Sequence, residues 1–345
     1  MPRPTFPARG FVLVLTAWTA LSTVTTVPIS SRPAVAEPPM NARARLTIAA
    51  AGDIVCQGDP GSDPSTCRYD DTADLVVGQG FTKILLLGDD QYETGAFRAF
   101  QTWFDPTWGR AFSRLAPSPG NHEYAQDPGS RPRGYFRYFG RDVKGPDGLG
   151  YYSFDIGACP DLPCWHVISL SSELCFATGG CDAPADPSNP GTGEQMYAWL
   201  QADLATHPNV DYPCTLAYWH HPLFSFSTGS GATQAVKPLW DLLYDAHAEL
   251  VLNGHSHNYQ RWKPQDPEGG LDRAGGIREF IVGTGGKSLY ALESGPAPAH
   301  LVTAQDEAFG ILKLTLGRAG YTWEWLGAAG QPAFTDTATR SAKCT

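Results

Sequence analysis

Several features are missing from this sequence, and each absence excludes a class of protein. After the N-terminal segment, no hydrophobic run approaches the length needed to cross a membrane. No Gly-x-Ser-x-Gly motif is present, which argues against a serine hydrolase of the nucleophile-elbow type. Basic residues are scarce: 25 lysines and arginines face 35 aspartates and glutamates, for a formal net charge of −10. A surface this acidic is a poor candidate for binding nucleic acid.

The N-terminal segment is the one place where a long apolar run occurs. Arg3 and Arg9 precede the run GFVLVLTAWTALSTV, and the small residues of Ala34–Ala36 follow it. This order of basic, apolar and small residues predicts a secretory signal peptide over residues 1–36, and hence a secreted, extracellular protein. An uncleaved membrane anchor is the alternative, and the threonines in the run argue against it. A Pro/Ala-rich linker is predicted over residues 37–45.

The eight cysteines fit an oxidising compartment, because their number is even and their spacing matches no zinc motif. Sequence alone leaves the connectivity open. Closure of the shortest loops favours four pairs: Cys56–Cys67, Cys159–Cys164, Cys175–Cys181 and, for the two that remain, Cys214–Cys344.

Strand-like and helix-like segments alternate through the rest of the chain. Apolar runs predict strands over 46–55 and 83–90, and apolar residues at helical spacing predict a helix over 193–207. The stretch 177–193 is too rich in proline and glycine to be regular. No repeat or break in composition divides the chain, so a single domain is predicted over 46–345. Mixed alternation with several β segments favours a layered α/β sandwich.

Five predicted strand ends carry side chains that can bind metal. They are Asp53, Asp89–Tyr92, Asn121–Glu123, His220–His221 and His255–His257. In open α/β sheets the carboxyl ends of the strands surround a crevice, so side chains distant in sequence can converge there. His255 and His257 are two residues apart, and in an extended segment they would face the same side.

The carboxylate, imidazole and amide groups in this set exceed what one ion needs. A carboxylate can bridge two ions, and two ions about 3.5–4 Å apart form the clamp used in phosphoryl displacement. Oxygen and nitrogen ligands suit iron, manganese or zinc. Such ions would also supply the positive charge that an acidic chain needs to handle a phosphate.

As an ordered set, these motifs resemble the metallophosphoesterase (calcineurin-like phosphoesterase) superfamily, and the version with a tyrosine resembles the purple acid phosphatases. The motifs are Gly52-Asp53, Gly88-Asp89-x-x-Tyr92, Gly120-Asn121-His122-Glu123, Ala217-x-x-His220 and Gly254-His255-x-His257. The resemblance implies a four-layer αββα sandwich with a single catalytic domain. The first motif lacks the family's last glycine, the fourth has alanine for valine, and the family's second histidine cluster after the fourth motif is missing.

The resemblance also implies a ligand set for two metal ions. The first ion, expected to be ferric iron, takes Asp53, Tyr92 and His257. The second ion, expected to be zinc, iron or manganese, takes Asn121, His220 and His255. Asp89 bridges the two.

Residues beside these ligands are candidates for other roles. His122 is expected to orient the phosphate of the substrate and to protonate the leaving group. Asn121 and His221 are further candidates for substrate binding. Asp90 is either an acceptor behind the ligands or a surface group. The nucleophile would be a metal-bound hydroxide, because bound metal ions lower the pKa of water.

The sequence thus predicts a secreted dinuclear-metal phosphatase that hydrolyses small phosphomonoesters. A phosphodiesterase or nucleotidase on the same fold is the nearest alternative, because these enzymes share the metal site and differ in the residues that line the substrate pocket. A non-catalytic exported module that binds phosphate or metal is a second alternative, against which the full ligand set and His122 argue. No membrane or nucleic-acid partner is expected, and the oligomeric state is left open.

Overall fold

A computed structural model describes residues 46–58, 67–125, 131–146, 148–159, 164–176, 180–182, 193–208, 214–318, 320–339 and 342–344. The predicted signal peptide, the linker and most of the stretch 177–193 lie outside these residues. Residues Ala42–Thr345 form one compact unit. Among the described helices, none is both long and apolar enough to cross a membrane.

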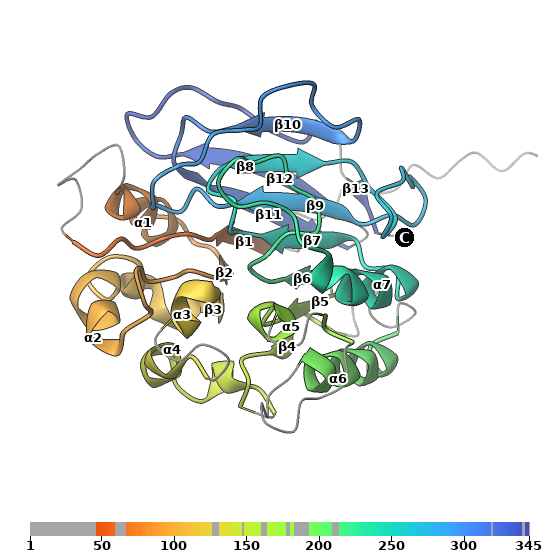
Figure 1. The fold of residues 1–345 in the computed structure, drawn as a ribbon, viewed down its shortest axis with the longest axis horizontal. Coiled ribbons are helices and arrows are strands. Elements are labelled where there is room, and N and C mark those ends of the chain that lie inside the picture. Colours follow the sequence, from red (N-terminus) through yellow and green to blue (C-terminus); the bar gives the residue numbers. More distant parts are fainter. Residues whose placement is uncertain are drawn as a thin grey trace, which may run out of the picture. The chain divides into compact units, whose positions relative to one another are not determined.

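Two β-sheets form the centre of this unit (Figure 1). The strand order of the first sheet is β13-β12-β11-β1-β2-β3. Its strands are β1 (Leu46–Ala51), β2 (Lys83–Leu87), β3 (Leu115–Ser118), β11 (Gly310–Gly317), β12 (Gly320–Gly327) and β13 (Ala342–Lys343). Strands β1, β2 and β3 run parallel, whereas β11 pairs antiparallel with β1, with Leu46 opposite Leu316.

The strand order of the second sheet is β10-β8-β9-β7-β6-β5-β4. Its strands are β4 (Tyr152–Gly157), β5 (Cys164–Ser169), β6 (Thr215–Tyr218), β7 (Leu250–Asn253), β8 (Tyr259–Trp262), β9 (Arg278–Val282) and β10 (Leu301–Gln305). Strands β5, β6, β7 and β9 run parallel, so their carboxyl ends lie at one edge of the sheet.

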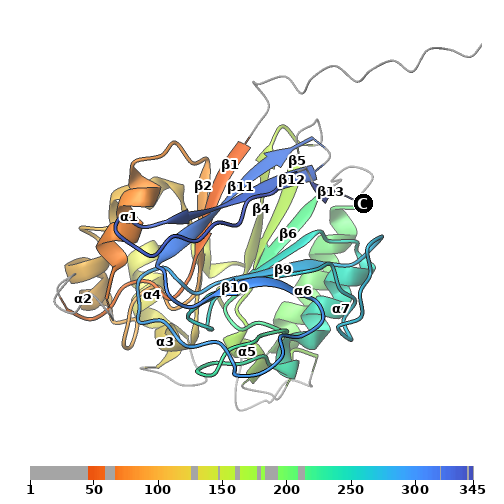
Figure 2. The ribbon, with the colours of Figure 1, turned by 90° about the horizontal axis from the view of Figure 1, so that it is seen from above.

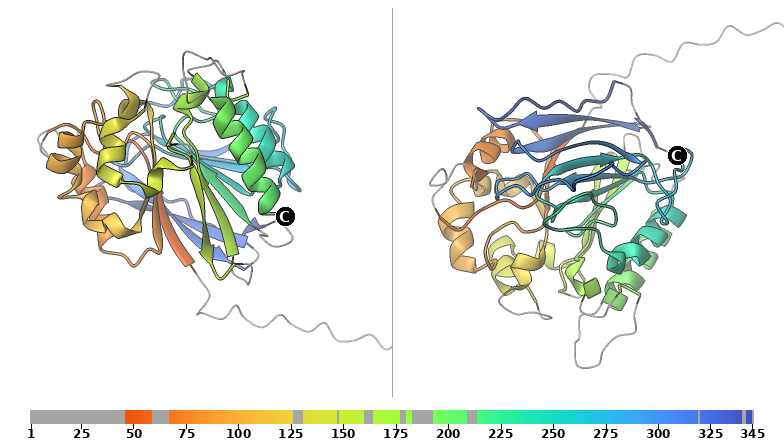
Figure 3. Two further views of the ribbon diagram at one scale, coloured as in Figure 1. Left: turned by 90° about the horizontal axis from the view of Figure 1, so that it is seen from below. Right: turned by 45° about the horizontal axis from the view of Figure 1, so that its top comes forward.

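Helices cover the outer face of each sheet, with α1 and α2 on one side and α6 and α7 on the other (Figure 2). The α-helices are α1 (Tyr69–Val77), α2 (Phe97–Ala99), α3 (Asn121–Tyr124), α4 (Arg133–Phe139), α5 (Glu173–Phe176), α6 (Gly193–Thr206) and α7 (Lys237–Asp245). A π-helix, η2 (Phe100–Phe104), continues α2, and η3 (Trp108–Arg114), η4 (Asp142–Lys144) and η5 (Gln234–Val236) are 3₁₀ turns. Helices α6 and α7 lie side by side in both views of Figure 3. This order of layers confirms the predicted αββα sandwich.

The second sheet is buried on both faces, which explains its nearly continuous apolar strands. In β5, Val167 packs in the core shared by the two sheets, while Ile168 packs in a separate core with α6 and α7. In β6, Leu216 and Ala217 divide in the same way. Each strand therefore contributes alternate side chains to two cores, as the period of two requires.

The predicted helix over 193–207 is confirmed as α6, and all four predicted disulfides are present. The predicted strands 46–55 and 83–90 are too long, because β1 ends at Ala51 and β2 at Leu87. The sequence interpretation also missed the strands β8 and β10 and the helix α4. Strand β8 reads Tyr-Gln-Arg-Trp, and its polar residues conceal the apolar signal.

An ion-pair cluster joins β4, β5 and α6; its His166 side chain is buried, whereas the side chain of Asp155 is 34% exposed. His166 Nδ1 lies 2.9 Å from Asp155 Oδ1, and His166 Nε2 lies 2.8 Å from Asp203 Oδ2. The ring of His207 stacks on that of His166, with centroids 3.8 Å apart. Burial lowers the pKa of His166, but the carboxylates of Asp203 and Asp155 outweigh burial and raise it above its ordinary value.

We expect His166→Gln to destabilise the protein most at acidic pH. Because the folded-state pKa is raised, the charged cluster stabilises the fold fully below the ordinary histidine pKa of about 6.5, and this stabilisation is lost as the pH rises through the raised pKa. The free energy of unfolding should fall by about 3 kcal/mol in mildly acidic buffer and by clearly less in alkaline buffer. Chemical denaturation in both buffers measures this, with His300→Gln as the control. Equal losses at the two pH values would contradict a charged His166.

Candidate metal centre

The predicted ligands meet where parallel strands of both sheets end. Asp53 follows β1, Asp89 follows β2, His220 follows β6 and His255 follows β7. Asp53, Asp89 and His255 have positive φ angles of 58°, 51° and 66°. A side chain disfavours this left-handed backbone, which is found at sharp turns. Each turn ends its strand and directs the side chain into the space between the strand ends.

Tyr92 is at the centre of the first ligand group. Its hydroxyl oxygen lies 2.9 Å from Asp53 Oδ1, 3.1 Å from Asp89 Oδ2 and 3.0 Å from His257 Nε2. His257 Nδ1 donates to the carbonyl oxygen of Ser288, 2.7 Å away, so Nε2 is the nitrogen that faces the site. Burial and the Asp53 carboxylate raise the pKa of the Tyr92 phenol well above its ordinary value.

His220 and His255 form the second group, where Asn121 is the third expected ligand. His220 Nε2 lies 3.1 Å from Asp89 Oδ2 and 3.3 Å from His255 Nδ1, while His220 Nδ1 donates to the carbonyl oxygen of Leu87 at 2.9 Å. Burial lowers the pKa of His220, but the Asp89 carboxylate outweighs burial and raises it to about 10. Asn121 Oδ1 is buried and has no hydrogen-bond partner among the described residues.

The expectation that His255 and His257 share one face of an extended segment is wrong. Strand β7 ends at Asn253, and His255 takes the left-handed conformation, so the chain turns between the two histidines. His255 therefore faces His220, whereas His257 faces Tyr92. The turn places the two imidazoles in different ligand groups.

The arrangement fits a pair of metal ions. Asp53 and Asp89 are buried, and neither forms an ion pair with a lysine or arginine of the described residues. The single proton of the Tyr92 hydroxyl can satisfy only one of the three polar atoms that lie within 3.1 Å of the hydroxyl oxygen. Ligand atoms of Asp53, Asp89 and His220 lie within 4.8 Å of one another. Asp89 Oδ2 contacts both ligand groups and is placed to bridge two ions.

Glu123 holds together the loops that carry the ligands, a role that the sequence interpretation missed. Its carboxylate accepts hydrogen bonds from the backbone N–H groups of Asp89 (3.0 Å), Gln91 (3.1 Å) and Gly120 (2.8 Å). Burial and the Asp89 charge raise the pKa of Glu123 to about 8. The only sequence signal for this role is the place of Glu123 at the end of the third motif.

His122 lies at the rim of the site, where 28% of its side chain is exposed. Its Nδ1 donates to the carbonyl oxygen of Glu93 at 2.6 Å, and its Nε2 lies 3.8 Å from Asp89 Oδ2. Nε2 therefore points toward the ligands. The interpretation of Asp90 as a surface group is wrong, because Asp90 is fully buried; within the described part of the chain, neither of its carboxylate oxygens has a hydrogen-bond partner.

His221 lines the site beside the second ligand group. Its ring centroid lies 4.2 Å from that of His255 and 4.4 Å from that of Phe176. Its Nδ1 is 2.9 Å from Ser172 Oγ, and its Nε2 is 4.0 Å from Glu173 Oε2. This wall comes from the loop after β5 and from α5.

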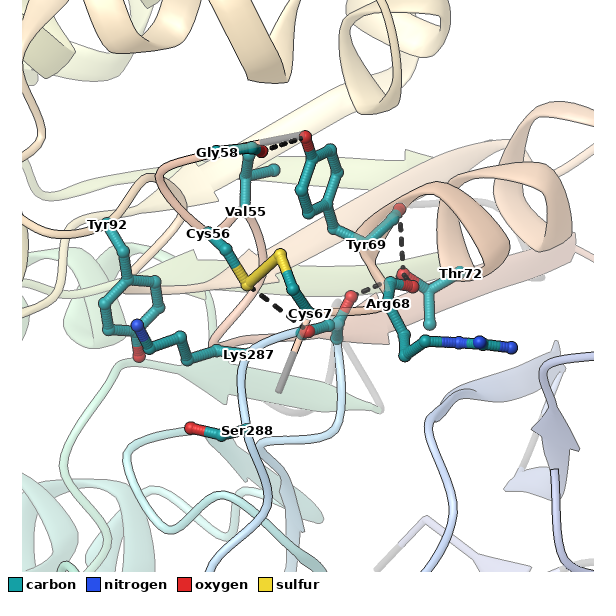
Figure 4. The surroundings of a disulfide bond; sticks show 12 residues. Val55, Cys56, Gly58, Cys67, Arg68, Tyr69, Thr72, Tyr92, Lys287 and Ser288 are labelled. Carbon is teal, nitrogen blue, oxygen red and sulfur yellow. Dashed lines mark hydrogen bonds between the residues drawn. A yellow bond between two sulfur atoms is a disulfide. The ribbon is translucent and has the colours of Figure 1, made fainter. Parts of the chain in front are cut away.

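The segment Gly285–Ser288 packs against the first ligand group and beside the Cys56–Cys67 disulfide (Figure 4). The Lys287 N–H donates to the carbonyl oxygen of Asp53 at 2.9 Å. Gly286 has φ +151°, and a Cβ atom there would lie 2.6 Å from the carbonyl oxygen of Ile54, so the close approach requires glycine. The segment thereby brings the Ser288 carbonyl to His257.

Comparisons with known proteins agree with this geometry. Residues 46–259 match the family model for Calcineurin-like phosphoesterase. Purple acid phosphatase 21 from Arabidopsis thaliana is 26% identical over 294 residues, covering 79% of this chain and 59% of the relative. Purple acid phosphatase 22 from the same plant is 27% identical over 179 residues, 51% of this chain and 36% of the relative. An acid phosphatase from Aspergillus ficuum is 23% identical over 291 residues, 73% of this chain and 45% of the relative.

Solved structures show the same fold. Purple acid phosphatase PPD1 from yellow lupin (Lupinus luteus) seeds matches with a TM-score of 0.65 and 15% identity, over 85% of this chain and 53% of the lupin chain. GAP50 of Plasmodium matches with a TM-score of 0.61 and 13% identity, over 87% of this chain and 90% of that chain.

The chain spans between 36% and 59% of the length of the curated relatives named above. The segment matched by the family model covers more than half of this chain and includes every strand-end motif of the site. The resemblance inferred from those motifs is confirmed, and this chain belongs to the calcineurin-like phosphoesterase family.

Proposed function

We propose that this protein is a secreted phosphatase that hydrolyses small phosphomonoesters with the help of two metal ions. The observation that carries the proposal is the convergence of buried metal-binding side chains on the Tyr92 hydroxyl, with His122 at the rim of the site. The names of the plant and fungal relatives support a phosphatase. The four disulfides and the predicted signal peptide support secretion. The catalytic domain is proposed to span residues 46–345.

The proposed ligands are seven side chains of the strand-end motifs. Asp53, Tyr92 and His257 hold the first ion, Asn121, His220 and His255 hold the second, and Asp89 contacts both. The phenol favours ferric iron at the first position, and the mixed oxygen and nitrogen donors suit zinc, iron or manganese at the second. When bound, such ions neutralise the phosphoryl oxygens and supply a nucleophile from water.

The residues around the ligands orient the ligand side chains and protonate the leaving group. The carbonyl groups of Leu87 and Ser288 fix the rings of His220 and His257 so that each Nε2 faces the site. The Glu93 carbonyl does the same for His122, which leaves the Nε2 of His122 to face a bound ester. A proton held on that nitrogen can pass to the departing oxygen. His221 and Asn121 are proposed to contact the phosphate from the side of the second ligand group.

The first experiment compares kcat/KM on p-nitrophenyl phosphate and on bis-p-nitrophenyl phosphate, with protein loaded in turn with iron, zinc and manganese. We expect metal-dependent hydrolysis that chelation abolishes, with a clear preference for the monoester. A preference for the diester would make the protein a phosphodiesterase. Hydrolysis of neither ester by metal-loaded protein would leave a binding module and contradict an enzymatic function.

We expect His122→Ala to lower kcat about 100-fold on alkyl phosphates, whose leaving groups need a proton. The loss should be much smaller on p-nitrophenyl phosphate, because p-nitrophenolate departs without one. Metal content, measured by elemental analysis, should stay at the wild-type value because His122 lies outside the ligand groups. Equal losses on both classes of ester would mean that His122 does not act as the acid.

Ferric-loaded protein should show a visible charge-transfer band that disappears in Tyr92→Phe. The band arises only if the phenol binds the iron, and absorbance spectra of matched iron content measure it. Tyr290→Phe is the control, because the Tyr290 ring stacks on His257 at a centroid distance of 3.9 Å and belongs to neither ligand group. A band that survives Tyr92→Phe would remove Tyr92 from the ligand set.

A further inference from the structure

One lysine side chain, that of Lys287, reaches the site. The ammonium group of Lys287 lies over the Tyr92 ring, 4.8 Å from its centroid (Figure 4), and forms an ion pair with Glu93. Among the described residues, Lys287 is the only lysine or arginine with an ion pair or cation–π contact to Tyr92 or its neighbours in the site. Its side chain is 22% exposed, so it is partly accessible to solvent.

The backbone of Lys287 is held in place from several directions. It forms a β-bridge with Cys67, which is bonded to Cys56, and its N–H donates to the carbonyl oxygen of Asp53. The next residue, Ser288, accepts a hydrogen bond from His257. The ammonium group is therefore carried by a backbone segment that contacts two proposed ligands of the first metal, Asp53 and His257.

The partner of Lys287 in this structure is exchangeable. The side chain of Glu93 is 50% exposed, and ion pairs between exposed groups are weak because water and salt screen them. The carbonyl oxygen of the same Glu93 accepts the hydrogen bond of His122 Nδ1. The Lys287–Glu93 pair thus lies beside the histidine proposed to protonate the leaving group.

The wall of the site formed by Glu173 and His221 carries a negative charge, opposite in sign to that of Lys287. Glu173 lies 4.0 Å from His221, and no lysine or arginine of the described residues forms an ion pair with Glu173. Phe176, 42% exposed, covers the ring of His221 on this side. An anionic group on a bound ester is attracted toward Lys287 and repelled by Glu173, so the charges of the two walls favour one orientation of such a substrate.

We infer that Lys287 is a specificity-determining residue that binds a second anionic group, a carboxylate or a phosphate, on the leaving-group side of the substrate. Glu93 is the partner that this group replaces. The inference rests on the proposed function, because it assumes that the site hydrolyses phosphate esters, and it adds the substrate class: small phosphomonoesters whose alcohol carries a second negative charge close to the ester.

Two esters of equal length test this. 3-Phosphoglycerate and glycerol 3-phosphate differ by a carboxylate in place of a hydroxymethyl group, so the ratio of their kcat/KM values measures recognition of the second charge. We expect Lys287→Met to lower this ratio about tenfold, the loss of one charge-assisted hydrogen bond, and Lys287→Arg to restore most of it. Added salt should lower the wild-type ratio by screening the same charge.

Glu93→Gln gives the opposite sign. Removal of the competing carboxylate frees the ammonium group, so the ratio should rise about threefold. This variant also keeps the inference testable if Lys287→Met fails to fold. The matched control is Lys313→Met: Lys313 pairs with Glu324 at 2.9 Å with similar exposure, but on β11 and β12, and its loss should leave the ratio unchanged.

The outcomes separate the two hypotheses. If Lys287→Met and Glu93→Gln both leave the ratio unchanged while p-nitrophenyl phosphate is still hydrolysed, Lys287 does not select substrates and the proposed function stands. If Lys287→Met lowers kcat/KM equally for both esters, Lys287 has a general role and the inference is wrong. If the metal-loaded wild-type protein hydrolyses no ester, the proposed function itself has failed.

Discussion

The structure depends on one electrostatic constraint: the carboxylates of Asp53 and Asp89 are buried close together at the ends of β1 and β2. Two buried carboxylates and the Nε2 atom of His257 surround the single hydroxyl of Tyr92, and His220 faces Asp89 beside them. No lysine or arginine of the described residues pairs with either carboxylate. The parallel strands, the turns that end them and the carbonyls behind the imidazoles all place acceptors around this point. The fold therefore gathers, at one point, carboxylate, phenol and imidazole groups of the kinds that bind metal ions.

Much of the ligand set could be predicted from the sequence because each ligand follows an apolar run at a strand end. Parallel strands bring such positions together whatever lies between them, so the order of the motifs was sufficient to predict that Asp53, Asp89 and His220 converge. The four disulfides were predicted for a similar reason, because three of them close short local loops. The ligand prediction thus depended on the shared direction of parallel strands, and the disulfide prediction on short loops.

The rest depends on contacts that leave no pattern in the sequence. Backbone carbonyls orient His220 and His257, and any residue at Leu87 or Ser288 would supply a carbonyl. Glu123 was visible as part of a motif, but its three backbone hydrogen bonds follow from the meeting of two loops. Lys287 lies 30 residues beyond the last motif and reaches Tyr92 only through tertiary packing. The lengths of β1 and β2 were overestimated because the hydrophobic pattern does not reveal the turns at Asp53 and Asp89.

The left-handed backbone at Asp53, Asp89 and His255 limits which residue types can occupy these positions. Glycine would adopt this conformation without strain, but it has no side-chain atom that can bind metal. Glutamate does have such atoms, but the turn disfavours its longer side chain, as it disfavours the bulk of a branched side chain. Aspartate, asparagine and histidine are the residues that enter this region most readily after glycine, and each carries an oxygen or nitrogen that binds metal. The left-handed backbone conformation and metal coordination therefore favour the same few residue types. Substitutions at these three positions are therefore restricted by two independent requirements: the backbone conformation and the need for an atom that binds metal.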